Sequence, residues 1–279
     1  MINKEKSIQE LLKFSIINID KPSGPTSFQI SNFIRKSFNI SKTSHFGTLD
    51  PQVSGVLPVA LGRACRLNEY FMHNDKTYVG IMRLHKDISE GELKKAISSF
   101  IGKITQTPPV RSRVKRAPRE REIKSFKIIE KEGKDVLFET SVQAGTYIRK
   151  LCDDIGKKIG GAHMLELRRT KASIFQEENS INLYDFESFL EQSKKGNETR
   201  LRNILIPAEE AIKKVMPVIQ AKESSIKQLM TGKPLMKHDI AGKLPEKEIF
   251  AVFNEHKFIA VMKKSEEGDI IARPEFVFN

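Results

Sequence analysis

The sequence contains no tryptophan and only two cysteines among its 279 residues. Cys65 and Cys152 lie far apart and have apolar neighbours, so we expect free thiols in a reducing compartment, the cytoplasm, rather than a disulfide framework or a zinc site. Residues 1–13 are charged and lack an apolar signal core, and no apolar run reaches membrane-spanning length. Phosphate-cradling glycine loops and metal-ligand clusters are also missing. We therefore expect no membrane role and no cofactor.

What the sequence has in excess is positive charge. Its 48 lysines and arginines outnumber 35 aspartates and glutamates, which gives a formal net charge of +13 and a pI near 9.6. This surplus favours a polyanionic partner, and without a membrane signal that partner is RNA or DNA. A lysine-rich protein that binds no polyanion would have the same charge, so the motifs must decide.

The hydrophobic pattern alternates between strands and helices, which predicts an α+β fold. Short apolar runs predict strands at residues 16–20, 77–84, 126–129 and 136–142, the last two forming a hairpin that turns at Gly133. Capping and turn signals predict helices that start near Thr26, Ser89 and Gly145. The helix after Ser89 is expected to end at Gly102.

After Met216-Pro217 the pattern becomes β-rich, with strand-like segments at residues 249–253, 258–262 and 270–278. A module of about sixty residues is small for independent stability, so we expect it to pack on the first domain. The expected division is residues 14–212 for the large domain and 216–279 for the small one, with residues 1–13 as a candidate addition to the latter.

The stretch His45-Phe46-Gly47-Thr48-Leu49-Asp50-Pro51 is the most informative part of the chain. It places one carboxylate, Asp50, between a Gly-Thr turn signal and a proline that stops a helix. A carboxylate on such a short, stiff loop is held in position. Taken alone, however, Asp-Pro is a common turn dipeptide and predicts only a turn.

Other motifs accompany this loop. In chain order they are DKPSGPTS (20–27), HFGTLDP (45–51), SGVLP (54–58), KTY (76–78), TPPVRS (107–112), GTYIR (145–149), GAH (161–163) and LRRT (167–170). Each is weak by itself, but together and in this order they resemble the pseudouridine synthases of the TruB and dyskerin type. The tail is similar to a PUA domain, a small RNA-binding β fold.

The resemblance implies both a fold and a reaction. The fold is a mixed central β-sheet with flanking helices, followed by the small PUA-like domain. The reaction is the isomerisation of a uridine in rRNA or tRNA to pseudouridine, in which the glycosidic bond is cut and the uracil is turned and rejoined through carbon. This redox-neutral reaction needs no cofactor.

Three residues match catalytic positions of the family. Asp50 matches the essential aspartate, which could attack the ribose or the base or take the 2′ proton; the sequence leaves these routes open. Tyr147 matches a tyrosine near the uracil and suits proton transfer at C5. Arg149 matches the arginine that pairs with the aspartate, keeping it ionised and fixing its rotamer. Without the family, Arg149 would be a helix-start arginine on a solvated face.

Five further residues are expected to bind substrate. Tyr78 matches the family's stacking residue for the flipped base, although alone it would be taken for a core aromatic of a strand. His45 is expected near the RNA, and Leu167 matches an apolar residue that lines the uracil pocket. Lys21 and Lys115 complete the set.

The segment from Val110 to Lys124 is the most basic part of the chain. Read alone it is a solvated charged loop, but beside synthase motifs it favours contact with phosphates and salt-sensitive binding. The residues expected to bind RNA there are Arg111, Arg113, Arg116, Arg119 and Arg121.

The spacing of the motifs also indicates a branch of the family. Leu84 is followed almost at once by the helix at Ser89, so the insertion with which stand-alone bacterial enzymes grip the tRNA T-arm is absent. Residues 111–116 and 163–170 resemble the archaeal dyskerin homologue. That resemblance implies an H/ACA ribonucleoprotein, in which an H/ACA guide RNA selects the uridine and two small accessory proteins assist, one zinc-ribbon-like and one glycine/arginine-rich-related.

One departure from the family and two alternative functions remain open. Ser44 and Phe46 flank His45 where the family has small residues, so Phe46 could crowd the RNA or pack beneath the loop. The chain could instead be a guide-independent synthase for the tRNA T-arm uridine, which would modify unmodified tRNA without partners. It could also be a non-catalytic RNA-binding scaffold, which would bind RNA and form no pseudouridine.

Overall fold

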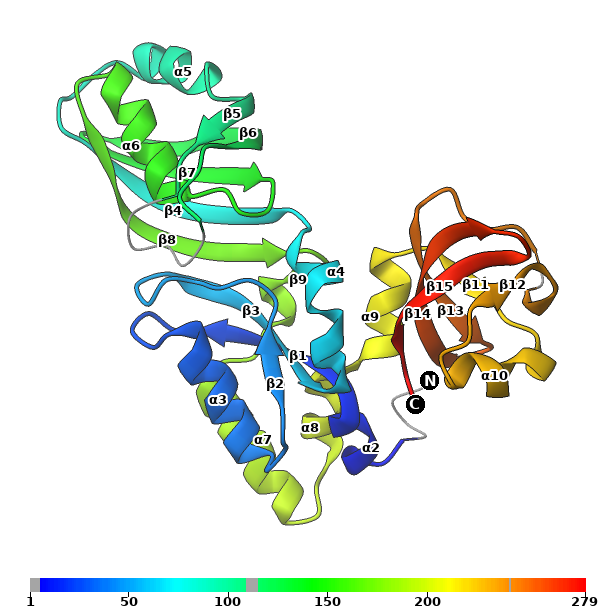
Figure 1. Cartoon of the computed structure of the whole chain (residues 1–279). Coiled ribbons are helices and arrows are strands. Elements are labelled where there is room, and N and C mark those ends of the chain that lie inside the picture. The colour runs from blue at the N-terminus through cyan, green and yellow to red at the C-terminus, as the bar shows by residue number, and fades with distance from the viewer. Residues whose placement is uncertain (1–5, 109–114, 241) are drawn as a thin grey trace.

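The computed structural model describes residues 6–108, 115–240 and 242–279. Figure 1 shows a large β-sheet in two halves, flanked by helices, and a smaller C-terminal sheet beside it. The arrangement is the mixed α+β fold expected from the sequence. Arg111 and Arg113, which are expected to bind RNA, lie outside the described residues.

Within the described residues, ten strands form the large sheet, in the order β10–β1–β3–β8–β4–β7–β6–β5, with β2 beside β3 and β9 beside β8. The lower half in Figure 1 contains β1 (Phe14–Lys21), β2 (Thr43–His45), β3 (Ser54–Gly62) and β10 (Leu205–Pro207). The upper half contains β4 (Lys76–Leu84), β5 (Gly102–Gln106), β6 (Arg119–Glu132), β7 (Asp135–Val142), β8 (Ala162–Ala172) and β9 (Phe175–Gln176). The predicted hairpin is β6–β7.

The two halves meet at a short parallel pairing of β3 with β8, which we call the seam. Ser54 pairs there with Arg168, and Gly55 with Arg169. Gly55 has a φ of +101°, and a Cβ at this position would overlap the backbone carbonyl of Arg169. Glycine therefore permits the close approach of the strands and brings the loop before β3 next to β8.

Helices bury the large sheet in two hydrophobic cores. The first core takes side chains from α2 (Ile8–Lys13), α3 (Ser27–Ser37), α5 (Glu90–Ser98), α6 (Ile148–Lys158), α7 (Leu183–Lys194) and α8 (Thr199–Ile204). The second takes them from α4 (Asn68–Met72) and α9 (Ala208–Val215). β1 serves both, with Phe14 and Ile16 in the second core and Ile17 and Ile19 in the first. A strand buried on both sides needs the continuous apolar run seen in the sequence.

Local signals fix the helix starts as predicted. The Thr26 hydroxyl accepts a hydrogen bond from the backbone of Gln29 at 3.1 Å, and the Ser89 hydroxyl accepts one from Glu92 at 3.2 Å. Each cap satisfies an N–H group that the first helical turn leaves unpaired. The prediction that Gly102 ends α5 was wrong, because the helix ends at Ser98 and Gly102 opens β5.

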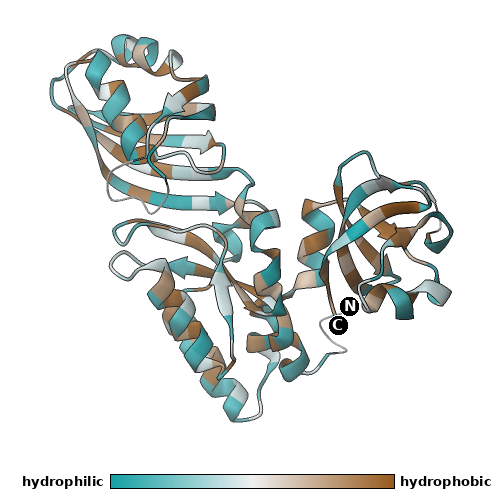
Figure 2. Ribbon diagram, in the orientation of Figure 1, coloured by the Kyte–Doolittle hydropathy of each residue, from teal (hydrophilic) through white to brown (hydrophobic). Residues whose placement is uncertain are grey.

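The C-terminal sheet has the order β11–β13–β14–β15–β12. Its elements are β11 (Val218–Gln220), α10 (Ile226–Met230), β12 (Leu235–Met236), β13 (Ile249–Asn254), β14 (Lys257–Glu267) and β15 (Ile270–Val277). Figure 2 shows apolar residues along these strands. Phe14 of β1 stacks on Phe258 with ring centroids 5.4 Å apart, so aromatic contact joins the two sheets. The strand positions confirm the β-rich tail, while the expected domain limits stay a prediction.

The N-terminal segment belongs with the large sheet. Leu11 and Leu12 of α2 are buried in the first core. The candidate addition of residues 1–13 to the small domain stays a prediction. The thiols of Cys65 and Cys152 are free, as expected. In the described part of the chain, no helix has the length and apolarity to cross a membrane.

The seam generates a test of stability. Gly55→Ala should lower the free energy of unfolding by about 3 kcal/mol or more, because it adds steric overlap to the strain of a positive φ. Gly102→Ala is the matched control, since Gly102 has a similar φ of +91° but open space around the added Cβ; it should cost about 1 kcal/mol. Urea denaturation measures both, and equal losses would contradict the role of the seam.

Candidate active site

Asp50 lies on the loop that leads into β3. Gly47, with a φ of +100°, bends the chain into this loop. The backbone N–H of Val53 donates to the Asp50 carbonyl at 3.0 Å, and the N–H of Gly24 donates to the Pro51 carbonyl at 2.9 Å. These hydrogen bonds hold the backbone of the loop that carries the carboxylate.

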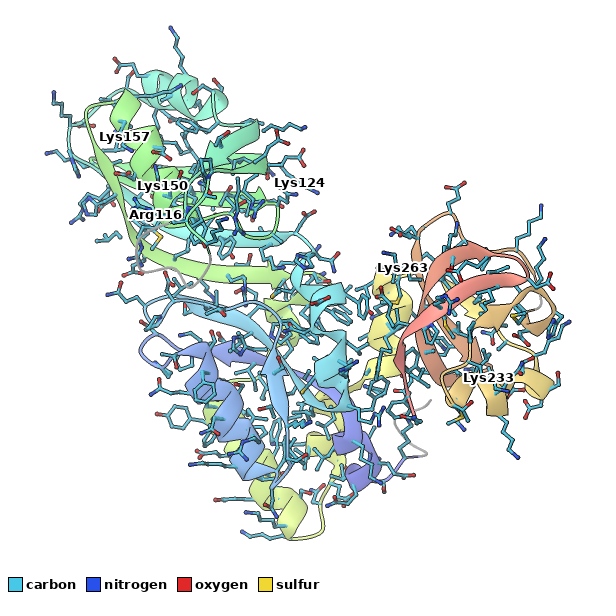
Figure 3. All side chains as sticks on the ribbon, viewed as in Figure 1. Arg116, Lys124, Lys150, Lys157, Lys233 and Lys263 are labelled. Atoms are coloured by element: carbon cyan, nitrogen blue, oxygen red, sulfur yellow. The ribbon has the colours of Figure 1, made fainter. Side chains whose placement is uncertain are left out.

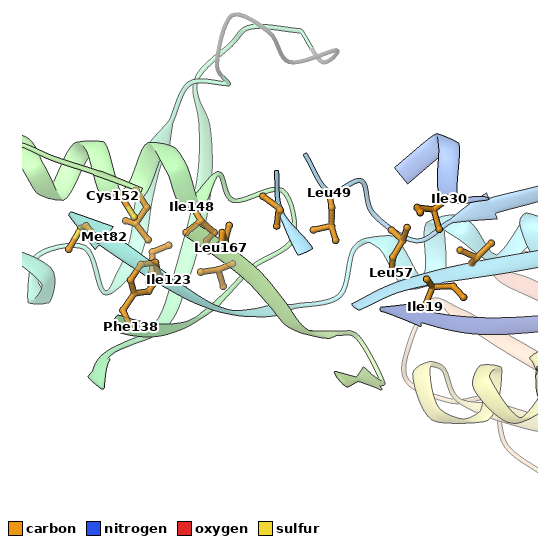
Figure 4. Close-up of a cluster of buried hydrophobic side chains, with 14 of the residues drawn as sticks. Ile19, Ile30, Leu49, Leu57, Met82, Ile123, Phe138, Ile148, Cys152 and Leu167 are labelled. Atoms are coloured by element: carbon orange, nitrogen blue, oxygen red, sulfur yellow. The ribbon is translucent and has the colours of Figure 1, made fainter. Parts of the chain in front are cut away.

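Leu49 anchors the same loop in the first core. Its side chain is buried, its backbone N–H donates to the Ser27 hydroxyl oxygen at 2.8 Å, and the Ser27 hydroxyl donates to its carbonyl at 3.1 Å. Figure 4 shows Leu49 between labelled apolar side chains of the two halves of the sheet. Because Leu49 points inward, the next side chain, Asp50, stays 65% exposed.

Arg149 reaches Asp50 from the start of α6. Its Nη2 lies 3.5 Å from Oδ2 of Asp50, and the two side chains are 57% and 65% exposed. An exposed pair of this kind contributes about 1 kcal/mol or less to stability. The pair expected from the sequence is therefore present, and both groups remain accessible to a ligand.

Tyr147 is the N-cap residue of α6 and is half-buried. Gln106, at the end of β5, holds its backbone: Nε2 of Gln106 donates to the Tyr147 carbonyl at 3.2 Å, and the Tyr147 N–H donates to Oε1 at 3.0 Å. Gln106 is buried, so this pair of hydrogen bonds is shielded from water. The start of α6, with Tyr147 and Arg149, is thereby fixed to the sheet.

Arg169 is the largest fully buried side chain of the described residues, with 1% exposure. Its Nε donates to the Val56 carbonyl at 2.8 Å and its Nη2 to the Gly47 carbonyl at 3.0 Å. It also hydrogen-bonds the side chain of Tyr78. One guanidinium therefore connects the Asp50 loop, β3 and β4. Burial lowers the pKa of this guanidinium, and the interaction with Tyr78 opposes that shift.

Two further buried cations lie around this loop. Lys76, beneath Gly47, donates to the Met72 carbonyl at 2.5 Å, and burial together with the charge of Arg169 lowers its pKa to about 8. Lys21 donates to the carbonyls of Pro22 at 2.7 Å and Pro51 at 3.0 Å. Burial and Arg169 also lower the pKa of Lys21, while Asp50 opposes the shift. The floor of the site therefore carries a positive potential that favours anions.

The other residues expected to bind substrate lie around Asp50 in different environments. Tyr78 is half-buried against the first core, and Leu167 is buried in it. His45 hydrogen-bonds Thr48 at 3.1 Å, and burial followed by the charge of Arg169 lowers its pKa, which favours the neutral ring. Lys21 is buried under the loop, so its role in substrate binding stays a prediction.

The basic segment is described from Lys115 onward. Lys115 and Arg116 are exposed, and Arg119 and Arg121 are half-buried on β6. Arg121 packs against Gly145, where an added Cβ would lie 3.1 Å from its guanidinium. The segment is thus a strand rather than a loop from Arg119, and it lies beside the turn that precedes Tyr147. Phosphate contact by these residues stays a prediction.

Phe46 packs beneath the Asp50 loop and does not crowd its outer face. It is buried and stacks on Phe71, with ring centroids 4.7 Å apart and planes 4° from parallel. Its size fills the second core. The departure from the family at this position therefore supports the loop from below.

No role was expected from the sequence for Arg169, Lys76, Gln106 or Ser27. Three of them lie in or beside quoted motifs: Ser27 ends DKPSGPTS, Lys76 opens KTY and Arg169 lies in LRRT. Gln106 directly precedes TPPVRS. Motifs marked these positions, but only packing shows that they support the site.

The geometry suits chemistry on a nucleotide. An exposed carboxylate, held on a stiff loop beside a guanidinium, can accept a proton or attack an electrophilic carbon. A tyrosine lies on β4 and another caps α6, and either ring offers a face or a hydroxyl to a base. Three buried cations would attract the phosphates around it.

Comparison with known families gives two adjoining matches. Residues 35–148 match the TruB family pseudouridylate synthase (N terminal domain), and residues 149–213 match the tRNA pseudouridylate synthase B C-terminal domain. Curated relatives include proteins named "Probable tRNA pseudouridine synthase B" from Nanoarchaeum equitans and Methanocaldococcus jannaschii. The first is 46% identical over 85% of this chain and 68% of its own length. The second is 41% identical over 85% of this chain and 71% of its own length.

Solved structures match over nearly the whole chain. A structure described as a Cbf5-Nop10-Gar1 complex has a chain that superposes with a TM-score of 0.91 at 36% identity, covering 99% of this chain and 88% of its own. A chain in a structure of an H/ACA RNP bound to a substrate RNA gives 0.89 at 34% identity, covering 99% of this chain and 89% of its own.

The buried guanidinium generates a prediction. Arg169→Met should lower the free energy of unfolding by roughly 2–4 kcal/mol, because two buried carbonyls and the Tyr78 hydroxyl lose their partner, while removal of a buried charge offsets part of that loss. The matched control is Arg168→Met. Arg168 is 36% exposed and pairs with Asp20 and Glu177, so its loss should cost about 1 kcal/mol or less. Comparable losses in denaturant titrations of the two variants would argue against the bracing role.

Proposed function

The chain belongs to the TruB family of pseudouridine synthases, and from this premise we propose that it isomerises uridines of RNA as the catalytic subunit of a guide-directed H/ACA ribonucleoprotein. In this proposal Asp50 is the catalytic carboxylate, assisted by Tyr147 and Arg149. The observation that carries the assignment is the 3.5 Å approach of Arg149 to the exposed Asp50, from a segment remote in sequence.

The reaction is balanced within the substrate. The bond between C1′ and N1 breaks, the uracil turns, and a bond forms between C1′ and C5. The proton lost from C5 is replaced by one gained at N1, so the product is an isomer of the substrate. Asp50 either attacks the ribose or the base, or removes the 2′ proton, and Tyr147 accepts the proton from C5. Arg149 positions the carboxylate.

Binding of an everted uridine follows from the surroundings of Asp50. The Tyr78 ring offers a stacking surface, which offsets part of the few kcal/mol, roughly, that unstacking costs. Leu167 would supply an apolar wall and His45 would lie near the RNA, while Lys21, buried under the loop, would add positive potential for the substrate. Lys115, Arg116, Arg119 and Arg121 would contact the backbone, because their charges lie on the segment that leads to the Gly145 turn.

Guide dependence is supported by two features. The matched chains cover this one almost completely; one comes from an H/ACA RNP bound to a substrate RNA and the other from a Cbf5-Nop10-Gar1 complex. β4 ends at Leu84 and α5 begins at Glu90, which leaves no room for a T-arm-binding insertion there. We propose that the C-terminal sheet acts as a PUA-like RNA-binding domain, and that partners equivalent to Nop10 and Gar1 assemble on this chain.

A second candidate is a stand-alone tRNA synthase that modifies the T-arm uridine. The names of the curated relatives favour it, since they specify tRNA as the substrate. It requires the same catalytic residues and differs only in how the uridine is selected.

The catalytic role of Asp50 has a direct test. Asp50→Asn keeps the shape of the side chain and removes the charge, so the single-turnover rate should fall by about a thousandfold or more. Tritium release from RNA labelled at uridine C5 measures the rate, and fluorescence anisotropy should show RNA binding within about twofold of wild type.

The matched control for this variant is Asp153→Asn. Asp153 is an exposed carboxylate on α6, the helix that carries Arg149, and it pairs with Lys157 at 3.1 Å. This variant should isomerise at the wild-type rate. Wild-type turnover by Asp50→Asn would refute the assignment.

Guide dependence is tested by reconstitution. The purified chain with unmodified tRNA alone should form no pseudouridine in the T-arm, because base pairing with a guide selects the target. With guide RNA and accessory proteins, modification should appear at the guide-paired uridine and move when the pairing sequence is shifted. T-arm modification by the chain alone would establish the second candidate instead.

A further inference from the structure

A polar cavity lies on the large sheet away from Asp50, and we call it the lysine pocket. It has a volume of about 320 Å³ and is lined by residues from the start of β4, the end of β7, the β8–β9 turn and the end of α9: Asn74, Asp75, Thr77, Ser141, Lys171, Ser173, Ile174, Lys214 and Val215. Thr77 and Ser141 are paired in the sheet. Because neighbouring side chains of a strand point to opposite faces, Thr77 faces away from Tyr78.

The charge of the lysine pocket is positive. Lys171 and Lys214 are exposed, and neither forms an ion pair with any described residue. The carboxylate in the lining, Asp75, is paired with Lys124 of β6. Figure 3 shows Lys124 at the end of the upper half of the sheet that is turned toward the C-terminal sheet. Because Lys124 neutralises Asp75, the ammonium groups of Lys171 and Lys214 remain available to bind an anion.

Ser173 adds a second, independent feature. It lies in the two-residue turn between β8 and β9 and has a φ of +58°, where glycine would be free of strain. Its N–H donates to the Asp75 carbonyl at 3.0 Å, which fixes it against the pocket. Ser173 therefore places a third hydroxyl in the lining, beside those of Thr77 and Ser141.

The composition of the lining defines the ligand. Among the described residues that line the pocket none is aromatic, so a base would find no stacking surface. Ammonium, hydroxyl and amide groups are instead the donors that bind phosphate and ribose oxygens of a nucleic acid backbone. The helix α9, whose end lines the pocket, packs on the C-terminal sheet, where Lys213 lies over the ring of Phe253, 4.9 Å from its centroid.

We propose that the lysine pocket binds a backbone phosphate of the RNA where its strand passes between the large sheet and the C-terminal sheet. The inference rests on the proposed function only in taking RNA as the ligand. Lys171 and Lys214 bind the phosphate, and the hydroxyls of Ser173, Thr77 and Ser141 surround it. The contact is independent of sequence and lies outside the catalytic centre.

The test compares a variant that removes positive charge from the lysine pocket with one that removes negative charge from it. Lys171→Ala/Lys214→Ala should weaken binding of a fluorescein-labelled guide RNA annealed to its substrate strand by about tenfold, and lower the slope of log affinity against log KCl concentration by about 0.7 or more. Asp75→Asn keeps the shape of the lining and removes its negative charge, so it should tighten binding. Anisotropy titrations over a series of KCl concentrations measure both effects with the full chain.

The control variant is Lys95→Ala/Lys194→Ala, which removes two exposed lysines from α5 and α7 and should retain the wild-type slope. At saturating RNA, Lys171→Ala/Lys214→Ala should isomerise uridine at the wild-type rate. Failure of the proposed function is a separate outcome: the Asp50→Asn variant would still form pseudouridine. If Lys171→Ala/Lys214→Ala keeps the wild-type slope of log RNA affinity against log KCl concentration, the proposal is overturned. This holds even if calorimetry shows that the pocket binds inorganic phosphate.

Discussion

The structure around Asp50 depends on the burial of one cation, the guanidinium of Arg169. Burying an ion costs several kcal/mol, which is a large fraction of the net stability of a folded protein, about 5–15 kcal/mol. The cost is offset by hydrogen bonds to the carbonyls of Gly47 and Val56 and to the Tyr78 side chain. Because those acceptors belong to separate segments, the same bonds hold the Asp50 loop, the seam and Tyr78 together.

The residues that hold the site in place differ from those that remain accessible to a substrate. The groups that brace the site, Arg169, Lys76 and Gln106, are buried, whereas Asp50 and Arg149 are exposed and only weakly paired. A carboxylate whose backbone is fixed but whose side chain remains accessible can meet a substrate without first being reorganised. The buried cations also bring the positive potential of a basic chain to the point where an RNA backbone must approach.

Much of this arrangement could be predicted from the sequence, because it is encoded locally. Capping residues fixed the helices at Thr26 and Ser89, and the motifs located Asp50 and its partner Arg149. Contacts between distant segments could not be predicted. Nothing in the sequence indicates that Arg169 is buried while its neighbour Arg168 pairs with Asp20, since both depend on the position of β8 beside β3. Nor does the sequence indicate that Phe46 packs on Phe71 of α4. The lysine pocket could not be predicted from the sequence for the same reason, because its lining residues come from separate segments of the chain.

The most direct test of the account is a crystal structure of the Asp50→Asn variant bound to its guide and substrate RNA. The account predicts that the target uridine is everted, that its base lies against the Tyr78 ring, and that its ribose lies within hydrogen-bonding distance of the side chain at position 50. A uridine still stacked in the RNA, or one bound with no contact to that side chain, would contradict it.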